Sequence, residues 1–203
     1  MKYLTILQIA ICYLIANQDL IGQNCKLAKD ELDPFTKKQV VLTKTFNMAN
    51  PITSEARKPI IHGQFGLEND SIYFKLQSII IVSGGILDDT DNLKEYIKFK
   101  ENDYLLIKFE NNDNLLKLRL YYQSQVSENR SAGMITLNTF AKFNLTQEDI
   151  NQFAKYKLEM LRFSKNNENE KIDYEIKNAN HKENVVSNAN CFLGALVRKS
   201  DVK

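Results

Sequence analysis

Residues 104–122 read YLLIKFENNDNLLKLRLYY, and this stretch does most to decide the fold. Apolar side chains stand at every second position in YLLIKF, a run of Asn and Asp follows, and the alternation resumes in LLKLRLYY. A period of two on both sides of a short Asn/Asp turn is typical of a β-hairpin whose strands each bury one face. We therefore predict two antiparallel strands here, with Leu105, Ile107 and Phe109 of the first strand facing the core.

Strand patterns recur on both sides of this hairpin. The clearest is 71–82, where Ile72, Phe74 and Leu76 alternate with more polar residues before a continuous apolar end. The predicted strands are residues 36–46, 60–65, 71–82, 93–100, 104–109, 116–122, 134–140, 157–164 and 171–177, the last two forming a second hairpin. The predicted turns and loops are Asp33-Pro34, 88–92 and 123–132.

Two segments carry helix signals. Thr146 precedes Gln-Glu-Asp, where its hydroxyl can cap the first turn, so a short helix is predicted over 146–155. The last segment changes to a helical period. Its apolar stripe consists of Val186, Ala189, Leu193, Leu196 and Val197. These patterns predict an α+β fold: a mostly antiparallel β-sheet, sandwich-like or curved, with one short helix and a C-terminal amphipathic helix.

The N-terminus has the features of a secretory leader. Met1-Lys2 gives a positive start, residues 3–16 are mostly apolar, and small or polar residues follow. This order is typical of a signal peptide, and the apolar run is shorter than the roughly 20 residues that span a bilayer as a helix. We expect residues 1–23 to be a signal peptide and residues 24–203 to form a single β-rich α+β domain. The protein would be exported to the periplasm or the extracellular space, with no transmembrane segment after leader cleavage.

Composition argues against some classes of partner. Hydrophobic residues make up 43% and charged residues 26% of the chain, close to globular averages, so a folded domain is expected. The formal net charge is only +2, with Lys and Glu interleaved. Such a balance creates no broad electrostatic attraction to nucleic acid or to an anionic membrane, and we expect no nucleic-acid partner.

Removing the leader takes away Cys12 and leaves two cysteines, Cys25 and Cys191. In an oxidising compartment such a pair normally joins, so a Cys25–Cys191 disulfide is predicted. On a helical projection Cys191 lies nearly opposite the centre of the apolar stripe, where an N-terminal arm could reach it. The alternatives are two free or intermolecular thiols, or a lipid anchor on Cys25, for which the preceding Gly22 and Asn24 are a poor match.

Several short motifs are similar to those of other secreted proteins. The start of the domain has an Asp-Pro-Phe-Thr-Gly-Lys-like motif, and a Lys-Gly-Asp-like turn precedes the 104–109 strand. The matching segments are Asp33–Lys38, Lys100–Asp103, Thr146–Glu148, Leu161–Phe163 and Asn180–Val197. Through them the chain resembles a loose group of uncharacterised secreted proteins of Bacteroidota-type bacteria over most of residues 25–198. The resemblance implies a fold and an exported location, and it carries over no site.

The chain departs from that group at two turns. Lys37 and Glu101-Asn102 stand where the group has glycine. Because glycine alone adopts left-handed backbone conformations without a steric penalty, we expect both turns to have a different backbone geometry here.

Residue types that carry catalysis are sparse. His62 and His181 are the only histidines, and neither has the spacing of a zinc site, so surface or capping roles are expected and no metal is predicted. The acidic segment 88–92, with Asp88, Asp89, Asp91 and Asn92, offers oxygen ligands without the spacing of a calcium loop, which favours a solvated loop. No phosphate-binding glycine loop or nucleophile elbow is present, so no cofactor is expected.

The sequence favours a binding function over a catalytic one. The expected function is that of a non-catalytic binding or envelope-associated interaction module, whose partner is an unknown protein or glycan ligand in the cell envelope. The alternative is a small secreted hydrolase with a carboxylate-based site, because acids such as Glu110 or Glu159 could converge in the fold. A purely structural envelope protein is a third alternative.

Overall fold

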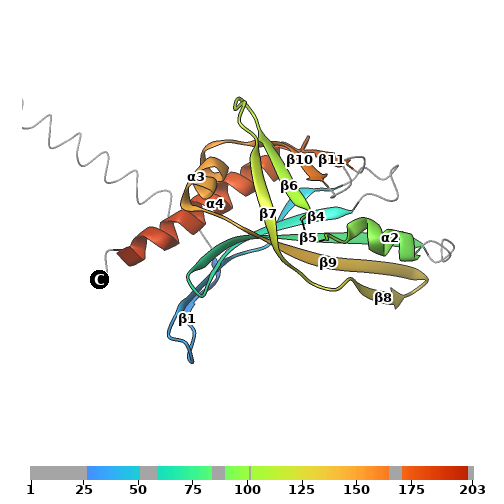
Figure 1. The fold of residues 1–203 in the computed structure, drawn as a ribbon, viewed down its shortest axis with the longest axis horizontal. Helices are drawn as coiled ribbons and strands as arrows, with labels where there is room; N and C mark the ends of the chain where they lie inside the picture. The colour runs from blue at the N-terminus through green and yellow to red at the C-terminus, as the bar shows by residue number, and fades with distance from the viewer. Residues whose placement is uncertain (1–26, 51–58, 84–89, 101, 165–170, 201–203) are drawn as a thin grey trace, which may run out of the picture.

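The structure, a computed structural model, describes residues 27–50, 59–83, 90–100, 102–164 and 171–200. Within these ranges the chain forms an antiparallel sheet of eleven strands and three helices (Figure 1). The predicted α+β class is therefore confirmed, including its mostly antiparallel sheet and C-terminal helix. The strands form one continuous open sheet instead of a two-layer sandwich.

Most of the strands are short, and many pair with a strand that is their neighbour in the chain. They are β1 (Leu27–Leu32), β2 (Gln39–Thr43), β3 (Phe46–Ala49), β4 (Ile60–Glu68), β5 (Ser71–Ser83), β6 (Tyr104–Phe109), β7 (Leu116–Gln123), β8 (Ser127–Ser131), β9 (Met134–Asn144), β10 (Leu158–Ser164) and β11 (Lys171–Glu175). The helices are α2 (Thr90–Ile97), α3 (Gln147–Lys155) and α4 (Ala179–Ser200). The strand order is β1-β2-β4-β5-β9-β7-β6-β10-β11, with β3 also paired to β4 and β8 to β9.

The central predicted hairpin is confirmed as β6 and β7. Leu105 pairs with Leu118 and Ile107 with Leu116 across the two strands. Leu105, Ile107 and Phe109 are fully buried, as the alternation requires. The second predicted hairpin is present as β10 and β11, which pair from Met160–Glu175 to Ser164–Lys171.

All three helices cover the same face of β5. On this strand Phe74 and Leu76 belong to the main core, together with side chains of α3 and α4. Ile80 and Val82 have the same parity along the strand, and they pack against Leu93 and Ile97 of α2 in a second, smaller core. None of the helices in the described residues covers the opposite face of β5.

Phenylalanine rings fill the main core. Phe65 of β4 is fully buried, and its ring centroid lies 5.2 to 6.1 Å from the rings of Phe46, Phe74, Phe153 and Phe192. These rings come from β3, β5, α3 and α4, so one cluster joins both helices to the sheet. Tilted and edge-to-face pairs of this kind add to the free energy of burial.

Helix α3 begins as predicted. Thr146 Oγ1 accepts a hydrogen bond from the Asp149 backbone N–H, and the Asp149 carboxylate accepts one from the Thr146 N–H, which completes a capping box. Ile150 and Phe153 of this helix are fully buried.

Two predictions of element type were wrong. The stretch 93–100 was predicted as a strand after an acidic loop, yet residues 90–97 form α2, because Leu93 and Ile97, four residues apart, bury one helical face on β5 and β9.

The predicted loop 123–132 contains β8, whose polar side chains hide its pairing with β9. Ala132 and Gly133 both have positive φ, which gives this hairpin a two-residue turn.

The first predicted strand, 36–46, is divided in the structure. Residues 34–36 form a turn, and the chain then makes β2 and β3 with a break between them. The acidic segment ahead of the turn is β1, which pairs with β2 and lacks an apolar face, so no alternation marks it.

The expectation that the two turns without glycine have a different backbone geometry was wrong, as Lys37 and Asn102 show. Their φ angles are +57° and +75°, so both residues adopt the left-handed conformation that glycine favours. The turn before β2 is held by Asp33, whose Oδ1 accepts hydrogen bonds from the Phe35 and Thr36 N–H groups. These bonds stabilise the left-handed turn, although the Cβ atom of Lys37 gives that conformation a steric cost.

The apolar stripe predicted for the last helix is rotated. The fully buried side chains of α4 are Val185, Ala189, Phe192 and Ala195, whereas Val197 is 55% exposed. At about 100° per residue the buried face lies roughly a quarter of a turn from the predicted one. Small side chains face the sheet because the helix lies close against β2 and β3. Cys191 consequently lies at the flank of the buried face, half-buried, and not opposite it.

Candidate functional site

The helix-free face of the sheet, here called the outer face, carries polar and aromatic side chains from four neighbouring strands. They are His62 and Gln64 of β4, Tyr73, Lys75 and Gln77 of β5, Asn138, Phe140 and Lys142 of β9, and Tyr122 of β7. The residues between them along β5 and β9 face the two cores.

Two lysines lie directly opposite each other at the centre of the outer face. Lys75 of β5 pairs with Lys142 of β9, and the same row continues to Gln64 on β4 and Tyr122 on β7. Like charges directly opposite each other on paired strands destabilise a sheet. The Lys75–Lys142 pair is therefore unfavourable for the stability of the sheet.

Each lysine extends over an aromatic ring of the other strand. Lys75 Nζ lies 4.3 Å from the ring centroid of Phe140, and Lys142 Nζ lies 4.3 Å from that of Tyr73. Both distances are within the range of cation–π attraction. The Tyr122 ring lies against Phe140 with 5.9 Å between centroids. The two ammonium groups thus diverge along the strands, each on its own ring.

The two lysines differ in their charge partners. Lys142 forms an ion pair with Glu68 at 3.0 Å, and this carboxylate and Tyr73 raise its pKa although burial opposes the change. In the part of the chain that the structure describes, no carboxylate forms an ion pair with Lys75. Burial lowers the pKa of Lys75, and the charge of Lys142 lowers it further. Lys75 is therefore the uncompensated cation of the outer face.

Amide groups border the lysine row. Gln77 Nε2 donates to Asn138 Oδ1 at 3.0 Å, and His62 is opposite Gln77 on β4. His62, one of the two histidines, thus lies on the outer face in register with this amide pair. It is half-buried.

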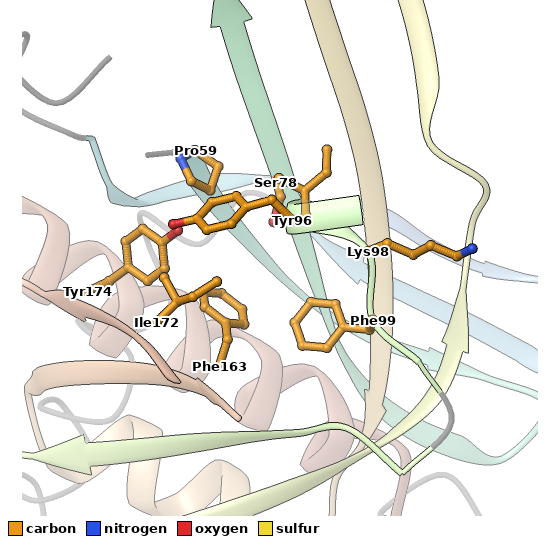
Figure 2. Close-up of a pocket in the computed structure, with 9 residues that line it drawn as sticks. Pro59, Ser78, Tyr96, Lys98, Phe99, Phe163, Ile172 and Tyr174 are labelled. Atoms are coloured by element: carbon orange, nitrogen blue, oxygen red, sulfur yellow. The ribbon is translucent and has the colours of Figure 1, made fainter. Parts of the chain in front are cut away.

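The inner face has a narrow pocket between the two cores (Figure 2). Its empty volume, open mouth included, is about 270 Å³, and the lining residues are Pro59, Ser78, Tyr96, Ile97, Lys98, Phe99, Phe163, Ile172 and Tyr174. Burial, and after it the charge interaction and hydrogen bond with Tyr96, strongly raise the pKa of the Tyr174 phenol, so it stays protonated. Among the described residues that line the pocket, none is Asp, Glu or His.

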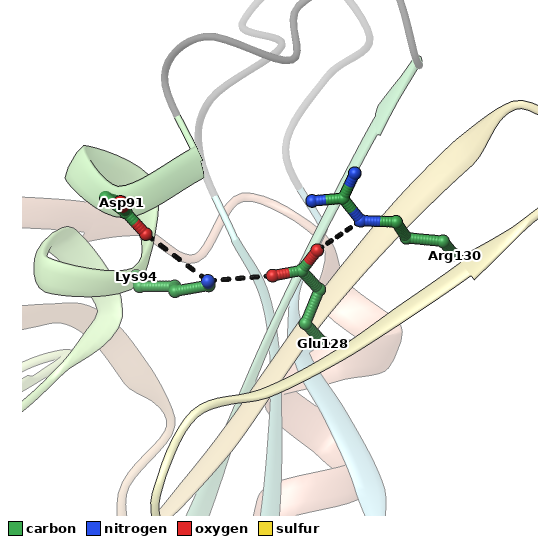
Figure 3. A network of polar contacts seen from close by, with 4 residues as sticks. All are labelled: Asp91, Lys94, Glu128 and Arg130. Atoms are coloured by element: carbon green, nitrogen blue, oxygen red, sulfur yellow. Dashed lines mark hydrogen bonds and ion pairs between the residues drawn. The ribbon is translucent and has the colours of Figure 1, made fainter.

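A chain of ion pairs holds α2 on the sheet next to this pocket (Figure 3). Lys94 Nζ lies 3.3 Å from Asp91 Oδ1 and 2.7 Å from Glu128 Oε2 of β8. The other carboxylate oxygen of Glu128 forms an ion pair with Arg130 Nε. Each pair has at least one side chain that is about a third exposed or more, so solvent screening limits the stability that it adds. Asp91 of the acidic segment thus belongs to a helix-docking network.

The remaining predicted residues do not assemble into a site. Glu110 forms an ion pair with Lys182 and Glu159 with Lys108, and neither acid lines the pocket. His181 lies in the first turn of α4. Cys25, together with Asp88 and Asp89, lies outside the described residues. Among the described residues no group of three or more His, Cys, Asp or Glu side chains could hold a metal ion.

The outer face was missed by sequence reasoning. Lys75 and Lys142 are 67 positions apart, and only the pairing of β5 with β9 places them opposite each other. Within the described ranges, every helix is too short or too polar to cross a bilayer. No protein-family model and no curated protein sequence matches this chain.

Proposed function

We propose that this protein is an exported, non-catalytic binding module that holds its ligand on the outer face of the sheet. Lys75 carries the proposal: a half-buried cation with no carboxylate partner among the described residues, opposite a second lysine. Such an arrangement lowers the stability of the free protein, and sites that oppose stability in this way are characteristic of function. A ligand that supplies the missing negative charge would remove the penalty.

Export is the second part of the proposal. It is supported by the leader-like residues 1–23. The compartment would be the periplasm or the extracellular space, and the ligand a component of the cell envelope. Mass spectrometry of the protein from its native host tests this, because an intact Met1 on a cytosolic species would contradict export.

A disulfide between Cys25 and Cys191 is the third part. The proposal is supported by α4, which carries Cys191 and packs against β1 and β2, because β1 begins at Leu27, two residues after Cys25 in the chain. Closing a loop of about 166 residues would stabilise the domain by several kcal/mol in the chain-entropy model. Thiol titration of denatured protein should give no free thiols without reductant and two per chain after reduction.

Binding by the outer face is tested with a matched pair of variants. Asn138→Glu places a negative charge on the outer face, where it would repel an anionic ligand and could itself pair with Lys75, and Asn184→Glu makes the same change at an exposed position of α4. The immobilised wild-type protein should retain material from a native envelope fraction. Asn138→Glu should abolish this retention, and Asn184→Glu should leave it unchanged. Equal retention by both variants would contradict binding at this face.

A further inference from the structure

We propose that the ligand of the outer face is an acidic polysaccharide, with an acid group of the sugar paired to Lys75 and a sugar ring lying against Phe140 and Tyr122. This inference rests on the proposed function and adds the chemical class of the ligand. The charge, the aromatic rings and the shape of the face each contribute a separate argument.

The lysine row provides the positive charge that an acidic sugar would meet. Lys75, Lys142 and Glu68 together carry one net positive charge, because Glu68 neutralises Lys142 alone. The cation that remains is half-buried on the Phe140 ring, where water screens it less than at the open surface. An anion bound here would gain a charge-assisted hydrogen bond and relieve the repulsion between the two lysines.

Aromatic rings lie next to Lys75 on the outer face. Tyr122 is 50% exposed and forms a continuous aromatic surface with Phe140. Aromatic faces bind the apolar C–H faces of sugars and leave the hydroxyl groups free to meet polar neighbours. The amide side chains of Gln77 and Asn138 lie next to this surface and can both donate and accept hydrogen bonds.

The shape of the face favours a chain over a single sugar. From Lys75 on β5 to Tyr122 on β7 the row crosses two strand spacings, about 10 Å. The pocket lined by Ser78 and Tyr174 is on the other side of the sheet, so the row from Lys75 to Tyr122 is separate from it. An extended oligosaccharide can lie across the strands and touch both residues at once.

Other macromolecules fit this face less well. A protein partner would need a central apolar patch that becomes buried, but the most exposed apolar side chains of β5 and β9, Ile81 and Met134, lie at the far end of these strands. Nucleic acid binding draws on many phosphate contacts, and one uncompensated lysine supplies too few.

The test uses a hexamer of galacturonic acid as the acidic sugar and its methyl-esterified form as the neutral match. Isothermal titration should show binding of the acid, weakened by about tenfold to a hundredfold on esterification, the range of a hydrogen bond to a charged group. A sulfated galactose hexamer separates the two sources of acid groups, carboxylate and sulfate. Binding of either acidic sugar that the neutral sugar does not match supports the proposal.

Two variants assign the effect to Lys75. Lys75→Gln should weaken binding of the acidic hexamer as much as esterification does, and Lys75→Arg, which keeps the charge, should retain most of it. Lys117→Gln is the matched control, because Lys117 also lies over a ring, that of Tyr104 at 3.8 Å, and its loss changes the net charge equally. Urea denaturation of each variant confirms folding, and Lys75→Gln should be at least as stable as the wild-type protein.

Several results would overturn the inference. They are equal affinity for the acidic and esterified hexamers, equal effects of Lys75→Gln and Lys117→Gln, tighter binding of hexaglutamate than of any sugar, and no binding of either acidic sugar. If Asn138→Glu still abolishes retention of envelope material in any of these cases, the binding face stands and only its ligand class is wrong. If it does not, the proposed function fails as well.

Discussion

Gly66 permits Tyr73 to lie flat across β4, and replacing it with alanine should destabilise the protein. A Cβ atom at Gly66 would lie 2.4 Å from Tyr73 Cζ, 2.6 Å from its Oη and 2.7 Å from its Cε2. Ordinary contact begins at 3.4 Å, so the ring has to retreat by about 1 Å. Tyr73 is only 5% exposed, and the Lys142 ammonium lies over its ring. This movement would therefore expose the ring and separate it from Lys142.

We expect Gly66→Ala to lower the free energy of unfolding by about 1–3 kcal/mol, the usual cost of an extra carbon in a packed site. Urea denaturation followed by far-ultraviolet circular dichroism measures it. Gly194→Ala is the control: apart from its chain neighbours and the backbone of its own helix, no atom lies within 4 Å of its Cβ position, and alanine in a helix should stabilise by about 1 kcal/mol. A Gly66→Ala variant as stable as the wild-type protein would refute the claim that Tyr73 is held in place by this glycine.

Three further changes test other parts of the fold. Lys37→Gly should raise the free energy of unfolding by about 1 kcal/mol, because it relieves a left-handed backbone at φ +57°; a loss in a urea titration would contradict this. Thr146→Ala should cost about 0.5–2 kcal/mol by removing the cap of α3, and an unchanged urea midpoint would count against the capping box. Phe153→Ala should cost about 3–5 kcal/mol, because its ring contacts those of Phe65, Phe74 and Phe109; thermal unfolding near the wild-type temperature would show that the core is not organised around it.

Local patterns predicted the parts of the fold that local chemistry specifies. The alternation around Leu105 and Leu118 identified the β6–β7 hairpin, and the capping residue Thr146 identified the start of α3. In both cases the residues whose pattern predicts the element also make the contacts that stabilise it. The prediction needed no knowledge of distant parts of the chain.

Errors arose where tertiary contacts select among local alternatives. Leu93 and Ile97 are compatible with a strand or a helix, and packing against Ile80 and Val82 of β5 selects the helix. β8 has no apolar face of its own, so only its backbone pairing with β9 makes it a strand. The face that α4 buries depends on how closely it approaches the sheet, which its own sequence does not specify.

By itself, the amino-acid sequence determined the α+β class, most of the strands, the capped helix and the closing helix, since these depend on residue period and on neighbours along the chain. Only the tertiary structure decided the outer face, because Lys75, Lys142 and Tyr122 meet through strand pairings between residues far apart in sequence. Opposing like charges become visible once β5 and β9 are paired in register. A binding face assembled from separate strands leaves no continuous motif in the chain.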